Sequence, residues 1–160
     1  MKSVLFTLLS AASLVLVSCQ TNPQGSPILG HNHNLSGESI GLFGYDPVSY
    51  FPEGGDKPEK GSINFTGEHE GVTYRFASKE HLTLFQDNPA KYLPAYGGWC
   101  AWAVGAIAKR VDVDPESYQI RDGRLYVFYR DQSLVTRDLW LKEPENLIAK
   151  GDANWPALAR

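Results

Sequence analysis

The stretch from Tyr74 to Ala103 begins Tyr-Arg-Phe-Ala-Ser-Lys-Glu-His (74–81) and ends Tyr-Gly-Gly-Trp-Cys-Ala-Trp-Ala (96–103). Two consecutive glycines, Gly97 and Gly98, can adopt backbone angles closed to other residues, and residues 99–109 lack proline, which predicts a short helix there. Cys100 would lie in its first turn, where free N–H groups and the positive helix end stabilise a thiolate. A Cys100 buried among neighbouring aromatic rings would instead be an inert small hydrophobe, and free cysteines are usually buried.

The size and composition of the chain predict one folded domain. It has 160 residues, of which 42% are hydrophobic, and this is enough to form a stable core without disulfides or structural metals. The formal net charge is −3, and no run of Lys and Arg is interleaved with aromatic residues. A nucleic-acid partner is therefore not expected.

The N-terminus is typical of a secreted protein. Residues 1–18 combine the positive Lys2 with a mostly apolar stretch, which predicts a signal peptide too short to span a membrane comfortably. The sequence Leu16-Val17-Ser18-Cys19 then resembles the bacterial lipobox, in which the signal is cleaved before a lipidated cysteine. This resemblance implies a lipid anchor on Cys19, and the following Gln20 favours the periplasmic face of the outer membrane in a bacterial envelope. A plain secretory signal or a chance cysteine is the alternative.

A flexible tether is expected between the lipidated cysteine and the domain, over residues 19–39. Gln20 to Ser39 is rich in Asn, Pro, Gly and Ser, so the folded domain is predicted to span residues 40–160. Within the tether, His31 and His33 have a spacing that can chelate a transition metal. The composition favours a solvated linker instead.

The first half of the predicted domain contains a hairpin and a helix. Short β-type runs at 62–65 and 72–76 flank a polar, glycine-bounded loop at 67–71, which would point His69 into solvent. Asp46 is placed to cap one helical turn that begins at Pro47. Ser78 is placed to cap a helix over residues 79–86.

The second half repeats this mixture of strands and helices. Residues 117–120 and 125–129 flank Asp122-Gly123, a strong hairpin signal, and alternation along these strands predicts one buried face. Asp131 is expected to cap a helix, and a shorter helix over 145–150 is expected to end at Gly151, with Trp155-Pro156 folding back as a lid. The fold class predicted is α+β, built of small hairpins and short helices.

Several motifs together resemble the YHS domain family, in its secreted branch that lacks the metal-type cysteines. The resemblance covers residues 44 to about 158 and rests on Gly44-Tyr45-Asp46-Pro47-Val48-Ser49-Tyr50-Phe51, Tyr74-Arg75-Phe76-Ala77-Ser78, Phe85, Asn88-Pro89-Ala90-Lys91-Tyr92, Tyr96-Gly97-Gly98-Trp99-Cys100-Ala101 and Asn154-Trp155-Pro156. It implies a treble-clef-like hairpin-and-helix unit, here extended by a C-terminal hairpin and helices.

The departures from this family limit the chemistry. Where the metal-type pattern has three cysteines, this chain has Ser49, Ala77 and His81. Ser and Ala cannot replace thiolates, so a closed tetrahedral site is not supported. Cys100 and His81 remain candidate ligands that could hold a cuprous ion weakly if their two helices approach each other.

Three functions are compatible with these residues. We expect a non-catalytic, membrane-tethered module that binds a metal of the copper type or a small ligand, with Tyr45, Tyr96, Trp99 and Trp102 as candidate ligand-binding residues. The first alternative is a redox or nucleophilic thiol at Cys100, with His81 or His69 as its base. The second is an envelope interaction protein that docks through Trp99 and Trp102. The familiar catalytic motifs are absent from the sequence.

Overall fold

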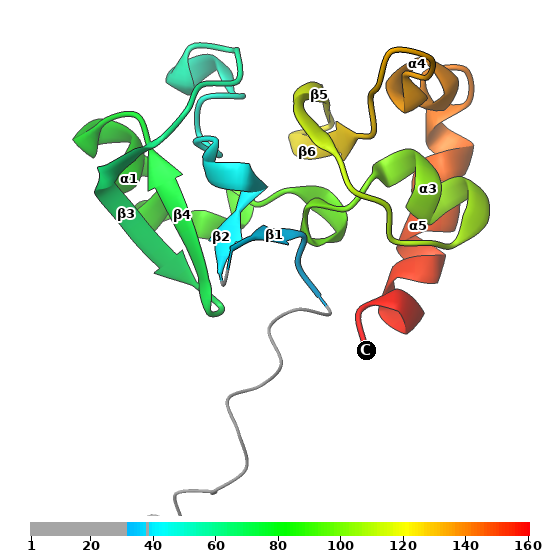
Figure 1. The fold of residues 1–160 in the computed structure, drawn as a ribbon, viewed down its shortest axis with the longest axis horizontal. Helices are drawn as coiled ribbons and strands as arrows, with labels where there is room; N and C mark the ends of the chain where they lie inside the picture. Colours follow the sequence, from blue (N-terminus) through cyan, green and yellow to red (C-terminus); the bar gives the residue numbers. More distant parts are fainter. Residues whose placement is uncertain (1–31, 38) are drawn as a thin grey trace, which may run out of the picture.

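A computed structural model describes residues 32–37 and 39–160 of the chain, and Figure 1 shows their arrangement. The predicted signal peptide at 1–18, Cys19 and His31 lie outside the described residues. Within the described ranges, no helix is long and apolar enough to cross a membrane. The predicted α+β class is confirmed, since helices accompany two small separate sheets.

The N-terminal lobe is built on a four-stranded sheet. Its strand order is β1 (Leu35–Ser36), β2 (Ile40–Gly41), β4 (Val72–Phe76) and β3 (Ser62–His69), and only the β2–β4 pair is parallel. Two helices, α1 (Lys79–Asp87) and α2 (Pro89–Tyr92), complete this lobe. Short 3-10 turns occupy Leu42–Gly44, Pro52–Gly54 and Ala95–Gly98.

Helix α1 begins where the sequence predicts. The Ser78 hydroxyl accepts a hydrogen bond from the backbone N–H of His81, which satisfies one of the free donors at the start of the helix. The hairpin before it differs from the prediction, because β3 continues to His69 and leaves only Glu70-Gly71 in the turn. His69 therefore does not simply point into solvent: its ring packs edge-on to Phe85, with 6.2 Å between ring centroids.

The C-terminal lobe contains the second hairpin and three helices. Strands β5 (Asp114–Arg121) and β6 (Arg124–Phe128) pair antiparallel. Both turn residues have positive φ, 51° at Asp122 and 74° at Gly123, as a two-residue type I′ turn requires. The helices are α3 (Ala101–Ile107), α4 (Thr136–Trp140) and α5 (Pro144–Leu158).

Helix α5 corrects two expectations. It continues through Gly151 to Leu158, so Gly151 does not end it and Trp155-Pro156 belongs to the helix rather than to a lid. The reason is packing, because a Cβ on Gly151 would lie 2.5 Å from the hydroxyl oxygen of Tyr96. Glycine at this position allows Tyr96 to approach α5 closely. In the sequence alone, such a glycine cannot be told apart from one that ends a helix.

Strand β6 separates two hydrophobic cores. Leu125 and Val127 are buried in the core of the N-terminal lobe, whereas Tyr126 and Phe128 are buried with Trp140 in the core of the C-terminal lobe. The prediction of one buried face is wrong for this strand, because successive side chains point to opposite faces and both faces are covered. Buried apolar residues are continuous along such a strand, as its sequence Leu-Tyr-Val-Phe shows.

The folded region begins earlier than residue 40. β1 pairs with β2, and Asn34 binds the 97–98 turn twice: its backbone N–H donates to the Gly97 carbonyl (2.8 Å) and its side-chain amide to the Gly98 carbonyl (3.2 Å). We call residues 32–36 the strap. Gly97 and Gly98 have φ of 60° and 85°, as their sequence predicts. A Cβ on Gly97 would lie 1.8 Å from the Asn32 carbonyl oxygen, so glycine is needed for the strap to lie there.

Candidate functional site

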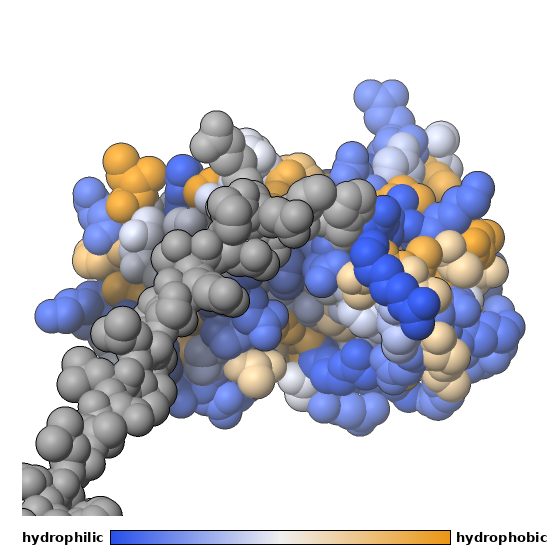
Figure 2. All heavy atoms as spheres, turned by 90° about the horizontal axis from the view of Figure 1, so that it is seen from below, coloured by the Kyte–Doolittle hydropathy of each residue, from blue (hydrophilic) through white to orange (hydrophobic). Residues whose placement is uncertain are grey.

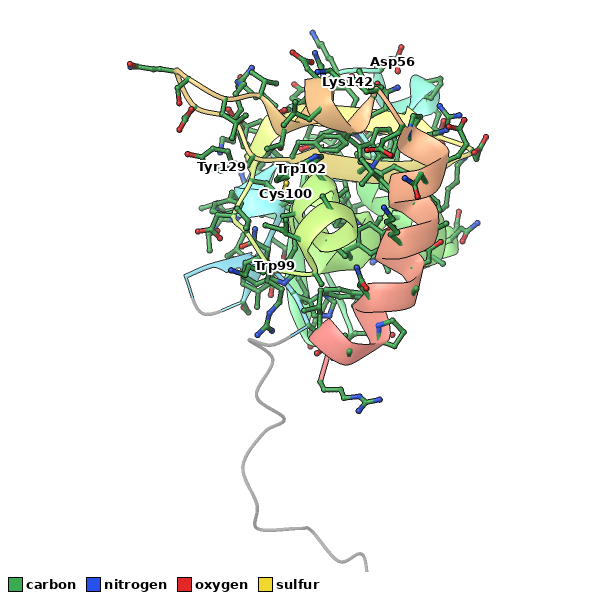
Figure 3. All side chains as sticks on the ribbon, turned by 90° about the vertical axis from the view of Figure 1, so that its right-hand side faces the viewer. Asp56, Trp99, Cys100, Trp102, Tyr129 and Lys142 are labelled. Atoms are coloured by element: carbon green, nitrogen blue, oxygen red, sulfur yellow. The ribbon has the colours of Figure 1, made fainter. Side chains whose placement is uncertain are left out.

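Cys100 is fully buried, with no solvent-exposed surface. It is the residue that precedes α3 rather than a member of its first turn, and its side chain makes no capping hydrogen bond. Its side chain borders an apolar cavity of about 160 Å³, lined in part by Trp102, Tyr129 and Leu134. Figure 3 shows Cys100 close to Trp102 and Tyr129, with Trp99 further away.

The Cys100 sulfur contacts the hydroxyl of Thr136. The Thr136 hydroxyl donates to the Tyr129 carbonyl at 2.9 Å. Its oxygen is 3.3 Å from the Cys100 sulfur and, with its own proton used, accepts from the thiol. The sulfur is thus held inside the fold by Thr136, and this hydroxyl is not a general base that could activate it.

Cys100 should therefore react slowly with alkylating reagents. In a Cys19→Ser chain, where Cys100 is the single thiol, we expect iodoacetamide at neutral pH to react at least about 100-fold more slowly than with the urea-unfolded chain, because reaction requires an opening that costs several kcal/mol. The measurement is thiol loss followed by mass spectrometry. A folded-state rate within about tenfold of the unfolded one would instead support the reactive-thiol alternative.

His81 is held by a buried carboxylate. Its Nδ1 lies 2.5 Å from Oδ2 of Asp46, whose side chain is completely buried. The same carboxylate accepts hydrogen bonds from the backbone N–H groups of Val48 and Ala77, each at 2.8 Å. Asp46 thus caps a turn over residues 47–50, as predicted, although no helix forms there.

Ser49, Ala77 and His81, the residues on which the predicted metal chemistry depends, surround Asp46. Ala77 and His81 bind its side chain, and the Ser49 hydroxyl donates to its backbone carbonyl at 2.7 Å. A network of hydrogen bonds occupies this place in the fold. Among the described residues, no group of three or more His, Cys, Asp or Glu side chains could hold a metal ion.

The structure does not bring the two candidate metal ligands together. His81 is in α1 of the N-terminal lobe and contacts Asp46, whereas Cys100 precedes α3 of the C-terminal lobe and contacts Thr136. Figure 1 shows α1 and α3 on opposite sides of the molecule. His69 lies on the N-terminal lobe as well, beside Phe85, so neither histidine is placed as a base for Cys100.

The four candidate ligand-binding residues are dispersed. Tyr45 lies under Lys60, whose Nζ is 3.9 Å from its ring centroid, and its hydroxyl donates to Glu116. Trp99 packs beneath the guanidinium of Arg110 at 5.7 Å, and Trp102 lines the Cys100 cavity. Tyr96 alone borders a larger cavity with polar groups.

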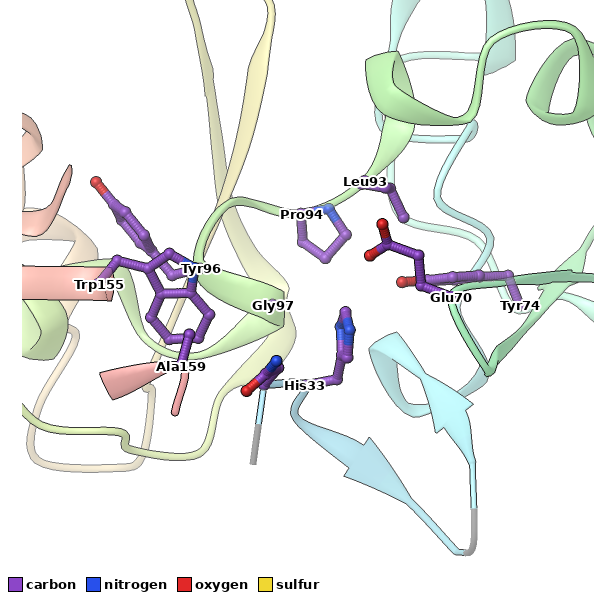
Figure 4. A pocket seen from close by; sticks show the side chains of 10 residues that line it. His33, Glu70, Tyr74, Leu93, Pro94, Tyr96, Gly97, Trp155 and Ala159 are labelled. Atoms are coloured by element: carbon purple, nitrogen blue, oxygen red, sulfur yellow. The ribbon is translucent and has the colours of Figure 1, made fainter. Parts of the chain in front are cut away.

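This larger cavity, which we call the interlobe cavity, lies where the two lobes meet the strap. It has a volume of about 280 Å³. The strap supplies His33, the β3–β4 hairpin supplies Glu70 and Tyr74, and the 3-10 turn supplies Tyr96. Trp155 comes from α5 and Ala159 directly follows this helix. Figure 4 shows His33 between the aromatic pair Tyr96 and Trp155 on one side and Glu70 with Tyr74 on the other.

Three polar groups on the rim and wall of this cavity have no hydrogen-bond partner within the described part of the chain: the His33 ring, the Glu70 carboxylate and the Tyr74 hydroxyl. Burial lowers the pKa of His33, although the Glu70 charge partly opposes this effect. Burial, and then Glu70, raise the pKa of Tyr74, so its hydroxyl stays protonated. Polar groups that converge on a cavity without internal partners are typical of ligand sites.

We compared the chain with known proteins. No family model, curated protein or solved structure matches it.

Sequence reasoning missed most of this site. The sequence predicts a solvated linker for His33, a hairpin loop for Glu70, a strand for Tyr74 and a lid for Trp155. Each residue is ordinary in its local sequence, and they meet only because the strap lies along the Gly97-Gly98 turn. The glycine pair was the one signal that a backbone segment approaches closely there.

The lowered pKa of His33 predicts that the stability of the protein depends on pH. Its folded pKa lies below the ordinary 6.5, so the stability it contributes is complete above about pH 6.5 and is lost as the pH falls through the folded value. We expect acidification from about pH 7.5 to 5 to lower the melting temperature less in His33→Gln than in the wild type. The melting temperature is measured at each pH by circular dichroism. An equal fall in melting temperature in the wild type and in His33→Gln would contradict this assignment.

Proposed function

We propose that this chain is a non-catalytic binding module for a small ligand, held at the membrane of a bacterial envelope through a lipid on Cys19, and that it is a YHS-type domain. The observation that carries the proposal is the interlobe cavity, where His33, Glu70 and Tyr74 converge without internal partners. Its volume of about 280 Å³ lies near the lower end of the range of roughly 300–1,000 Å³ for ligand pockets, which suits a small ligand.

The lining of the cavity favours binding over covalent chemistry. It contains no Cys, Ser or Lys side chain, and among the described residues no hydrogen bond joins His33, Glu70 or Tyr74 to a base that would activate it as a nucleophile. The thiol at Cys100 is buried against Thr136 in another part of the molecule. A small ligand is also better supported than a copper ion, because the two candidate metal ligands belong to separate lobes and have other partners.

A docking role through exposed aromatic residues has less support. On the face that Figure 2 shows, apolar side chains are dispersed among charged ones rather than gathered in one patch. In the described part of the chain, the most exposed large apolar residues are far apart in the sequence or on either side of α4: Ile63, Ile107, Leu134 and Leu141. Scattered exposed apolar residues are usual on soluble domains and do not by themselves mark an interface.

The test is a fragment screen by ligand-observed NMR on the wild type and on Ala159→Phe. Ala159 is partly exposed near the end of α5 and lines the cavity, so a phenyl ring there should fill the site and leave the fold intact. We expect small aromatic fragments to bind the wild type and to lose binding in the variant, with its circular dichroism unchanged. Binding that survives in Ala159→Phe, or no binding to the wild type, would overturn the proposal.

A further inference from the structure

We infer that the ligand of the interlobe cavity is a small organic cation, an amine or quaternary ammonium with an attached apolar group. This inference rests on the proposed function, because it names the chemistry that the same cavity would recognise. It follows from the charge of the lining, from the helix end that borders the cavity and from the aromatic rings around it.

The lining carries negative charge and no fixed positive charge. Glu70 contributes a carboxylate, and no Lys or Arg side chain lines the cavity. The His33 ring is neutral at neutral pH, because burial lowers its pKa, and therefore offers a lone pair. Arg160 follows the lining residue Ala159 but is itself exposed and does not line the cavity. An anion would find no charged partner among these side chains.

The last turn of α5 adds to this preference. Trp155 and Ala159 both line the cavity, and α5 is 15 residues long. The backbone N–H of Ala159 donates to the Trp155 carbonyl, and the carbonyls that follow lack helical partners. The C-terminal end of a helix carries partial negative charge, which favours a bound cation.

The aromatic rings supply surfaces that suit an alkylated ammonium. Tyr74, Tyr96 and Trp155 surround the cavity (Figure 4), and the rings of Tyr96 and Trp155 lie 5.9 Å apart. Ammonium groups bind the faces of such rings. Tyr96 already holds the Arg124 guanidinium at 5.7 Å, and Arg124 pairs with Asp152. The Tyr74 ring is buried against Phe85, so the partly exposed Trp155 is the ring that is left for a ligand.

The same lining disfavours a metal cation. A single carboxylate with one imidazole falls short of the six or more oxygen ligands that calcium takes and of the four that structural zinc takes. The described residues contain no set of three or more His, Cys, Asp or Glu side chains that could complete such a site. The apolar walls formed by Leu93, Pro94 and Trp155 suit an organic group instead.

The experiment compares three probes that share a phenyl ring and differ in charge: benzyltrimethylammonium, benzyl alcohol and phenylacetate. Each is titrated calorimetrically into the full chain and into Glu70→Gln. Glu68→Gln is the matched control, because it removes a carboxylate from the same hairpin but does not line the cavity.

We expect the wild type and Glu68→Gln to bind the ammonium at least about tenfold more tightly than the alcohol, and phenylacetate most weakly. Glu70→Gln should reduce the preference for the ammonium to less than about threefold. If the alcohol or phenylacetate binds as tightly as the ammonium, or if Glu70→Gln keeps the full preference, the cation inference is wrong while the binding module stands. Failure of all three probes to bind would count against both proposals.

Discussion

Replacing Asp46 with alanine is expected to lower the free energy of unfolding by about 3–5 kcal/mol, a large part of the roughly 5–15 kcal/mol of a typical domain. The Asp46 carboxylate is completely buried and accepts three hydrogen bonds, from Val48, Ala77 and His81. Its removal leaves two backbone N–H groups and one imidazole without their partner. Each unsatisfied buried group costs about 1–3 kcal/mol.

A comparison with His81→Ala separates the backbone hydrogen bonds of Asp46 from its contact with His81. This variant removes one partner and leaves the two backbone donors bound to Asp46, so we expect it to cost less than half as much as Asp46→Ala. The measurement is the free energy of unfolding of both variants from urea titrations, with the dependence on urea concentration (the m-value) fitted for each variant. Equal losses in the two variants would mean that the histidine contact, rather than the backbone bonds, gives Asp46 its importance.

The second large effect is expected at Gly105, where α3 and α5 cross. A Cβ at this position would lie 2.5 Å from the backbone oxygen of Leu147 and 3.3 Å from its Cα. Side-chain rotation cannot relieve a contact with backbone, so the two helices would have to separate. They are also tied together here by the Asn154 side-chain amide, which donates to the Val104 carbonyl at 2.9 Å.

Gly105→Ala should therefore destabilise the protein by about 1–3 kcal/mol, the usual cost of overpacking a core. The sign is informative, because the same change in an open helix stabilises it by roughly 0.5–1 kcal/mol. Ala106→Gly, at the exposed neighbouring position, measures separately how much alanine stabilises this helix relative to glycine. A Gly105→Ala variant that is more stable than the wild type in urea unfolding would show that the helices can move apart at little cost.

Local sequence signals predict the structure correctly where one short-range interaction decides it. The Ser78 cap of α1 and the Asp122-Gly123 turn need only neighbouring residues, and both form as expected. The same holds for the positive φ of Gly97 and Gly98. In each case the backbone preference or the capping side chain lies within a few residues of the structure it determines.

The predictions failed where a distant partner decides. Gly151 has the sequence signature of a helix end, but Tyr96 packs against it and α5 continues. Strand β6 has a second buried face because Trp140, from α4, covers Tyr126 and Phe128. Neither contact can be predicted from the local sequence, because the pattern of apolar residues and glycines is the same whichever distant residue packs against them.

By itself, the sequence determined the α+β class, the hairpins, the Ser78 cap and a buried, unpaired Cys100 as one of two alternatives. The expected Asp131 cap is wrong, because its carboxylate accepts from the N–H groups of Ser133 and Leu134 in a turn before α4, which has Val135 as its N-cap. Tertiary structure alone decided which alternative holds and where a ligand could bind. It buries Cys100 against Thr136, binds His81 to Asp46, and collects His33, Glu70 and Trp155 around one cavity. The physical reason is that side-chain chemistry depends on neighbours in space. The cavity residues His33, Glu70 and Trp155, for example, come from three segments that are far apart in the chain.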